Sequence, residues 1–231
     1  MISVLGGTGE CGKSLLKELL KTAHFENVNL VARRSQLTSL PVENPIKSVK
    51  ITENIVDFEK LCETTQNNEN NPFTNSKAVF CCLGTTKANA GSAEKFIRID
   101  KDYVIASAKH AKQAGVEEFH YVSASNSSAK SSFLYPRTKG EIEDELKALN
   151  FKRMAIYKPG LLFCDRTESR PGEAIARKIF GVFTIFGAEN PLGSIKTDDI
   201  GRAMVANSKQ GFEGYQCYST ADMMKLSKTL Q

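Results

Sequence analysis

The sequence predicts an α/β fold in which helices cover both faces of a doubly wound parallel sheet, with a small C-terminal substrate or lid region. Three observations predict this fold. Short apolar runs alternate along the chain with segments of helix length. A glycine-rich turn directly follows the first apolar run. The run at 77–83 is almost continuously apolar, which is typical of a parallel strand buried on both faces.

The elements are predicted in chain order from the period of their apolar residues. Short apolar runs predict strands at 1–5, 28–32, 53–56, 77–83, 118–122 and 152–157. Apolar residues at helical spacing predict helices at 13–22, 93–114 and 135–149. Right-handed crossovers then place these strands in one parallel sheet. After residue 157 the pattern weakens.

The chain has 231 residues, of which 41% are hydrophobic, so we expect a single domain over 1–231. The segment 65–76 is polar and rich in turn-forming residues, and we expect a mobile surface loop there. The segment 166–191 contains several Gly and Pro residues around a short apolar helix. Together with its flanks, over 160–195, it is expected to be the substrate or lid segment.

Composition excludes several classes of protein. The net charge is +5 and the basic residues are scattered, so direct nucleic-acid binding is not expected. Six cysteines show no C-x-x-C and no metal-ligand spacing, which indicates a reducing compartment and no metal site. No signal peptide is visible, and no apolar run reaches the roughly 18–20 residues of a membrane span. We therefore expect a cytoplasmic protein, with the nucleus as a further location, that is either a monomer or a homodimer.

The first candidate site is the turn at 6–12, which reads Gly-Gly-Thr-Gly-Glu-Cys-Gly. Its glycines fit G-x-x-G-x-x-G spacing from Gly6, or G-x-G-x-x-G spacing from Gly7, and both end on Gly9 and Gly12. Between a strand and a helix, such glycines let the backbone approach a pyrophosphate, whose charge faces the helix N-terminus. This is the fingerprint of a Rossmann-type dinucleotide site. Taken alone, the pattern also fits an ordinary glycine turn.

Arg33 and Arg34 indicate which dinucleotide is bound. Arg33 follows Gly12 by 21 residues, at the end of the second predicted strand. An NAD site usually has an acidic residue about 20 residues past the fingerprint, where it binds the ribose 2′-hydroxyl. Two guanidinium groups suit a 2′-phosphate instead, so the pair favours NADPH over NADH. The alternative is a solvated arginine pair on a loop.

Two further positions follow strands at the same edge of the sheet. Asp57 closes the third strand, where its carboxylate either accepts from the adenine amino group or caps the helix that begins at Phe58. Gly84 ends the fourth strand, where it lets the backbone run close to the cofactor ribose or serves as a plain turn glycine.

Tyr135 and Lys139 form a Tyr-x-x-x-Lys pair, and residues four apart lie on one face of a helix. An ammonium group beside a phenol stabilises the phenolate. Such a tyrosine can exchange a proton with a carbonyl or alcohol oxygen while a hydride moves at the neighbouring carbon. Lys139 is also placed to bind the nicotinamide ribose. An ordinary helix face explains the pair equally simply, but its place after the fifth strand favours catalysis.

Serines and one arginine complete the candidate set. Ser123, with Ser125 as the second choice, is placed to orient the reacting oxygen at the end of the fifth strand. Leu162 lies in the segment 159–162, which is placed to wall the nicotinamide pocket. Arg170 either reaches a phosphate or an acidic substrate, or is a surface arginine.

Together these motifs resemble the short-chain dehydrogenase/reductase superfamily in its atypical branch, and within it a group of pro-apoptotic NADPH binders. The similarity covers about 2–204 and rests on specific blocks at 6–10, 32–34, 56–61, 80–86, 131–135 and 164–173. It implies that Tyr135 is the proton donor and that protein partners exist. It implies NADPH contacts at Thr8, Gly9, Glu10, Cys11, Arg33, Arg34, Leu83, Gly84, Tyr135, Lys139, Leu162 and Arg170.

Three features depart from the pattern of these relatives. Cys11 stands where a threonine is usual, and Asp100 stands where many members use an asparagine to hold a proton-relay water. The relatives carry an N-terminal extension linked to partner binding, whereas this sequence starts at the first predicted strand, which puts those partners in doubt.

The leading hypothesis is an NADPH-dependent reductase of a small carbonyl substrate. The alternative is a regulatory NADPH-sensing protein, acting in transcription, apoptosis or trafficking, in which the cofactor orders a loop that a partner reads. A sugar-nucleotide epimerase is a third reading, which the limited room for a substrate domain disfavours. The sequence does not reveal the substrate.

Overall fold

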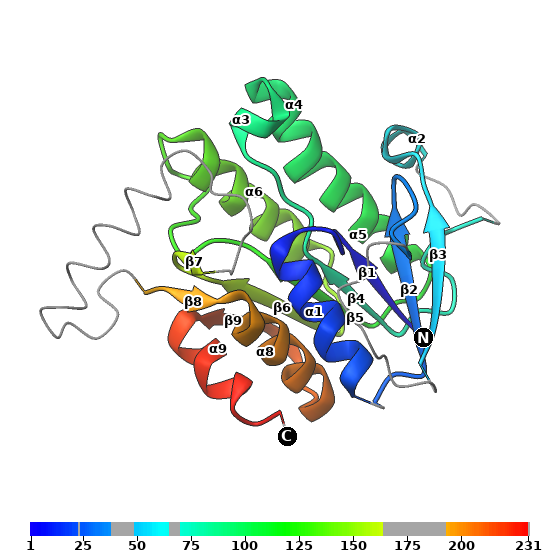
Figure 1. Cartoon of the computed structure of the whole chain (residues 1–231). Helices are drawn as coiled ribbons and strands as arrows, with labels where there is room; N and C mark the ends of the chain where they lie inside the picture. Colours follow the sequence, from blue (N-terminus) through cyan, green and yellow to red (C-terminus); the bar gives the residue numbers. More distant parts are fainter. Residues whose placement is uncertain (23, 38–48, 65–69, 164–192, 231) are drawn as a thin grey trace, which may run out of the picture.

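Seven parallel strands form the central sheet of the computed structural model, which describes residues 1–22, 24–37, 49–64, 70–163 and 193–230 (Figure 1). The strand order is β3-β2-β1-β4-β5-β6-β9. The strands are β1 (Ile2–Leu5), β2 (Asn27–Ala32), β3 (Lys50–Ile55), β4 (Ala78–Cys81), β5 (Glu118–Val122), β6 (Arg153–Lys158) and β9 (Gly214–Ser219). A separate parallel pair joins β7 (Leu162–Phe163) to β8 (Ile195–Lys196).

Helices cover both faces of this sheet. Those of the described part of the chain are α1 (Glu10–Lys21), α2 (Phe58–Glu63), α3 (Lys87–Ala90), α4 (Ala93–Ile97), α5 (Tyr103–Gln113), α6 (Leu134–Ala148), α8 (Thr197–Gln210) and α9 (Thr220–Ser227). A π-helical turn, η2 (Arg98–Asp102), connects α4 to α5. Successive side chains of a strand point to opposite faces, and the buried residues accordingly form two clusters. One cluster joins the sheet to α2, α5 and α6, and the other joins it to α1, α8 and α9.

The order in which strands are added reverses between β1 and β4. From β1 the chain adds β2 and β3 on one side of the sheet, and from β4 it adds β5 and β6 on the other. Val4 lies in register with Leu30 of β2 and with Phe80 of β4. In open α/β sheets, ligands bind in the crevice at the carboxyl ends of the strands at such a switch point. The predicted doubly wound Rossmann-type fold is therefore confirmed, and the sheet places the glycine turn after β1 at this crevice.

Several predicted boundaries change. The first helix begins at Glu10 rather than 13, and the helix predicted over 93–114 contains the η2 turn. The strands β8 and β9 and the helices α8 and α9 were not predicted. Strand β9 is an edge strand whose residues stay exposed or half-buried, so it has no apolar run to detect. Most of the predicted lid segment, 164–192, lies outside the described residues, and the single domain over 1–231 stays a prediction.

The prediction of a mobile loop over 65–76 is wrong for its described part, 70–76. Phe73 is fully buried, and Asn71 Nδ2 donates to the backbone oxygen of His110 at 2.8 Å. Asn29 Nδ2 donates to the backbone oxygen of Pro72 at 3.0 Å. Asn71, whose polarity suggested a surface loop, instead satisfies a buried backbone oxygen. These hydrogen bonds hold the segment against the rest of the fold.

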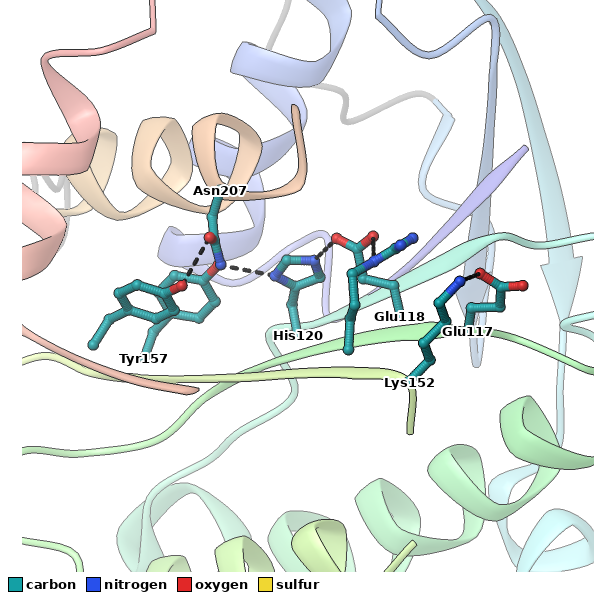
Figure 2. Close-up of polar contacts among 8 residues, drawn as sticks. Glu117, Glu118, His120, Lys152, Tyr157 and Asn207 are labelled. Atoms are coloured by element: carbon teal, nitrogen blue, oxygen red, sulfur yellow. Dashed lines mark hydrogen bonds and ion pairs between the residues drawn. The ribbon is translucent and has the colours of Figure 1, made fainter. Parts of the chain in front are cut away.

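A buried polar chain lies on the sheet face beneath α8, as Figure 2 shows. His120 contacts the carboxylate of Glu118 through Nε2 and the hydroxyl of Tyr157 through Nδ1, the latter at 2.9 Å. Asn207 Nδ2 donates to the same hydroxyl at 2.8 Å. Arg153 Nε donates to the second oxygen of Glu118 at 2.9 Å. This network fastens α8 to β5 and β6.

Candidate dinucleotide and catalytic site

The glycine turn is built for close backbone packing. Gly6 adopts a positive φ of 76°, and a Cβ atom there would lie 2.6 Å from the carbonyl carbon of Cys82. A Cβ atom on Gly12 would lie 2.1 Å from the carbonyl oxygen of Gly6. Gly9 is the N-cap of α1, and its amide donates to the Gly6 oxygen at 3.0 Å. Side chains at Gly6 and Gly12 would push the turn away from the sheet.

The start of α1 suits an anion. The first amides of a helix have no acceptor within the helix, and a glycine N-cap offers no side chain to them. A pyrophosphate at this position would meet both the amides and the positive end of the helix dipole. Thr8 is exposed, Cys11 is half-buried, and Glu10 pairs with Lys13 at 3.3 Å. The cradle therefore fits a dinucleotide.

The arginine pair lies beside this cradle. Arg33 and Arg34 are exposed directly after β2, and the turn that follows them is held by Glu53 of β3. Glu53 accepts from the Ser35 hydroxyl at 2.7 Å and from the Gln36 amide at 2.5 Å. A Cβ atom at Gly7 would lie 2.7 Å from Oε1 of Gln36. The fold thus brings together two motifs that lie far apart in the sequence.

Asp57 caps α2, because its carboxylate accepts from the Glu59 amide at 2.9 Å. The cap that the sequence offered as one reading is therefore present, whereas adenine binding by Asp57 stays a prediction. Tyr103 and Arg98 both bind Glu59, the former at 2.5 Å, and these hydrogen bonds lower the pKa of that exposed carboxyl. Burial and Glu59 raise the pKa of Tyr103 to about 12, while the charges of Arg98 and, to a smaller extent, Arg33 oppose the rise.

Lys139 lies buried at the other end of the crevice. Its Nζ atom donates to the Tyr121 hydroxyl at 2.9 Å and lies 3.1 Å from Oδ1 of Asp100. Burial alone would lower the pKa of Lys139, but Tyr121 and Asp100 outweigh it and raise the pKa above its usual value. A Cβ atom at Gly84 would lie 3.6 Å from this Nζ atom. Gly84 and Lys139 are thus neighbours, as a shared cofactor site requires.

Tyr135 is 42% exposed and lies one helical turn before Lys139 on α6. The Lys139 Nζ atom is 6.0 Å from the centre of the Tyr135 ring. Phe96 packs against the same ring, with 6.0 Å between ring centres. The phenol is therefore open on one side and supported on the other.

The predicted serines differ in their surroundings. Ser123 is buried, and its hydroxyl donates to the Glu143 carboxylate on α6, as does the Ser127 hydroxyl. Lys158 pairs with the second oxygen of Glu143 at 3.1 Å. Ser125 is exposed, and its backbone amide donates to the Pro159 oxygen at 2.9 Å. The structure thus ties Ser123 to a carboxylate that sequence reasoning missed, although Glu143 lies four residues after Lys139 on the same helix face.

Two of the remaining candidates are described and one is not. Leu83 is half-buried at the end of β4, and Leu162 is half-buried in β7. Arg170 lies outside the described residues. Sequence reasoning also missed Glu53 and Tyr121, which lie inside strands and carry no motif.

These features define a Rossmann-type dinucleotide-binding protein: a glycine cradle against the first helix, at the switch point of a doubly wound sheet. A family model described as NAD(P)H-binding matches residues 6–207, and the chain belongs to this family. Its cofactor class is thus a nicotinamide dinucleotide, and the expected resemblance to short-chain dehydrogenases/reductases is confirmed.

Two relatives and two solved structures illustrate the similarity. Protein HTATIP2 of Rattus norvegicus is 43% identical over 180 residues, which are 78% of this chain and 70% of that protein. Protein fmp52, mitochondrial, of Emericella nidulans is 32% identical over 216 residues, 92% of this chain and 89% of that protein. A UDP-N-acetylglucosamine 4-epimerase from Methanobrevibacter ruminantium M1 has a TM-score of 0.66 at 14% identity, covering 94% of this chain and 76% of its own.

The second structure is a dTDP-glucose 4,6-dehydratase variant from Streptomyces venezuelae with NAD bound. It has a TM-score of 0.66 at 15% identity and covers all of this chain and 80% of its own. Because both structures are so distant in sequence, they show the shared fold alone.

The predicted cytoplasmic and nuclear location is wrong by this comparison, because several fungal relatives are named mitochondrial proteins. The prediction relied on the lack of a signal peptide, which does not distinguish the cytosol from the interior of an organelle. Among the described residues, no helix is both long and apolar enough to cross a bilayer.

Proposed function

We propose that this protein is an NADPH-dependent oxidoreductase that reduces a carbonyl substrate. The observation that carries the proposal is the placement of Tyr135, half-exposed at the crevice, one turn before the buried ammonium of Lys139. Bound NADPH supplies the hydride. Tyr135 donates a proton to the carbonyl oxygen, and Lys139 binds the cofactor ribose through an N–H group. Ser125, which is exposed, is better placed than Ser123 to meet the substrate.

The preference for NADPH rests on Arg33 and Arg34. Both guanidinium groups stand exposed beside the glycine cradle, where they suit a 2′-phosphate. Replacing both arginines with alanine should weaken NADPH binding strongly and leave NADH binding nearly unchanged. An unchanged preference between the two cofactors in titrations would remove this argument.

The reductase is tested with Tyr135→Phe. This variant should bind NADPH as the wild type does, yet oxidise none of it when carbonyl compounds are added. A wild-type protein that binds NADPH but consumes none across a broad carbonyl panel would defeat the proposal.

A second candidate is a regulatory protein that binds NADPH without turnover. It is favoured by one observation: the Ser123 hydroxyl already donates to Glu143, so its proton is not available to a substrate oxygen. This candidate requires a protein partner whose affinity changes with NADPH. By linkage, equal partner affinity with and without NADPH would exclude a switch.

The names of the fungal relatives support a mitochondrial location for this protein as well. Fractionation of cells that produce the full-length protein, with a mitochondrial matrix marker as reference, tests it. Recovery in the cytosolic fraction alone would contradict the proposal.

A further inference from the structure

The ammonium of Lys139 is fixed by two side chains from different elements. Lys139 is 3% exposed, and a lysine ammonium has three N–H donors. One donates to the hydroxyl of Tyr121 on β5, and a second faces Asp100 in the η2 turn. Among the described residues no third acceptor contacts Nζ, so one donor remains for a ligand in the crevice.

Asp100 also holds the backbone that follows β4. Its Oδ2 atom accepts from the Thr85 amide at 2.7 Å, while its Oδ1 atom faces Lys139. Gly84, the residue before Thr85, lies beside both Asp100 and Lys139. The fully buried carboxylate of Asp100 therefore links two parts of the expected ribose site: the backbone at Gly84 and Thr85, and the ammonium of Lys139.

The π-helical turn explains why Asp100 reaches this position. A π turn adds a residue to the helical repeat and changes which side chains face the sheet, and such turns are frequent at functional sites. In η2, Asp100 is fully buried, whereas Arg98 and Asp102 stay half-buried and pair with each other at 3.1 Å. The turn thus directs one of its two acidic side chains inward and leaves the other at the surface.

Tyr121 supplies the second anchor. It is fully buried, and burial raises the pKa of its phenol, so the hydroxyl stays neutral and accepts from the ammonium. The Nζ atom also lies 5.1 Å from the centre of the Tyr121 ring, within the range of a cation–π contact. The position of the ammonium is therefore restrained from both the carboxylate and the phenol side.

We propose that Asp100 and Tyr121 are positioning residues that act through Lys139, holding its remaining donor toward the nicotinamide-ribose end of the bound dinucleotide. The proposal rests on the dinucleotide-binding part of the proposed function and not on turnover. Neither residue touches the cofactor itself. Their loss should weaken the nicotinamide half of the ligand's binding and spare the adenosine half.

The test compares two ligands on the full chain. NADPH spans both ends of the site, whereas adenosine 2′,5′-bisphosphate carries only the adenosine end. Asp100→Asn and Tyr121→Phe should each weaken NADPH about tenfold, the loss expected for one charge-assisted hydrogen bond. Both variants should bind adenosine 2′,5′-bisphosphate as the wild type does. Asp102→Asn, in the same turn but paired with Arg98, is the matched control and should change neither affinity.

A double-mutant cycle separates positioning from general structure. In a Lys139→Met background, Asp100→Asn should have no further effect on NADPH affinity, since it acts only through Lys139. Equal weakening of both ligands, an unchanged NADPH affinity, or additive effects with Lys139→Met would each overturn the proposal. If the wild type binds NADPH but reduces no carbonyl compound, the reductase proposal fails, and the binding measurements still test the positioning role of Asp100 and Tyr121. A wild type that does not bind NADPH would overturn both.

Discussion

A Cβ atom added to Gly12 would lie 2.1 Å from the carbonyl oxygen of Gly6, although the two residues stand at opposite ends of the glycine turn. The obstacle is backbone, so no side-chain rotation relieves it. The close approach of α1 to the end of β1 therefore depends on glycine at position 12, whether or not a dinucleotide is bound.

Gly12→Ala should lower the free energy of unfolding by about 1–3 kcal/mol, the usual cost of overpacking a rigid site, and should weaken NADPH binding as the turn shifts. Gly9→Ala is the control for folding, because its Cβ would lie 3.4 Å from the same oxygen and its φ is an ordinary −73°. Urea denaturation of both variants measures the difference. Equal stabilities would show that the turn adapts.

Glu53 gives a prediction on cofactor preference. Its carboxylate fixes the turn after the arginine pair through Ser35 and Gln36. Glu53→Ala should weaken NADPH roughly fivefold, equivalent to about 1 kcal/mol of lost hydrogen bonding, and affect NADH less. Lys50→Ala, an exposed change at the other end of β3, should affect neither cofactor. Parallel losses for NADPH and NADH would mean that Glu53 supports the sheet and not the arginines.

Sequence reasoning succeeded where the signal is local. The glycine turn and its adjoining strand and helix are contiguous, so their spacing alone predicts the cradle that Gly6 and Gly12 form. It failed where side chains meet from separate elements. Nothing local marks Tyr121, an apparently ordinary strand residue, as a partner of Lys139. The direction of the Ser123 hydroxyl depends on Glu143, which the separate helix α6 supplies, and the role of Ser123 in orienting the substrate oxygen stays a prediction.

The C-terminal part was missed for a different physical reason. Strand β9 pairs with β6 in regular parallel register, yet it lies at the edge of the sheet. An edge strand pairs with one neighbouring strand only, and the residues of β9 stay exposed or half-buried, so no apolar run marks it in the sequence. Helix α8 was missed as well. Its place is set by close packing against α1, where a Cβ atom at Gly201 would lie 2.7 Å from the carbonyl carbon of Ser14.

Glu143 is expected to contribute to stability through Ser123, Ser127 and Lys158. Glu143→Ala removes the acceptor of two hydroxyls and leaves the largely buried Lys158 unpaired. We expect a loss of about 1–3 kcal/mol in the free energy of unfolding. Glu145→Ala, on the same helix, removes a more exposed ion pair with Lys101 and should cost less than about 1 kcal/mol. Chemical denaturation distinguishes the two, and equal losses would contradict the role given to Glu143.

The buried chain in Figure 2 predicts how stability depends on pH. Burial alone would raise the pKa of Glu118, but the interaction with His120, helped by a hydrogen bond from Ser208 and by the charge of Arg153, outweighs burial and lowers the pKa below its ordinary value of 4.5. A carboxyl with a lowered pKa in the folded state stabilises the protein above its unfolded pKa. That contribution is lost as the pH falls from about 4.5 through the folded-state pKa.

Replacing Glu118 with glutamine should therefore make the free energy of unfolding less dependent on pH in the acid range, as well as lower at neutral pH. The neighbouring Glu117 is the matched control: it is exposed and pairs with the exposed Lys152 at 3.5 Å (Figure 2). Glu117→Gln should keep the pH dependence of the wild type, because an exposed pair adds little to stability. Urea denaturation at a series of pH values from neutral downward measures both slopes. A Glu118→Gln variant that loses stability in acid as steeply as the wild type would show that other carboxylates control acid unfolding.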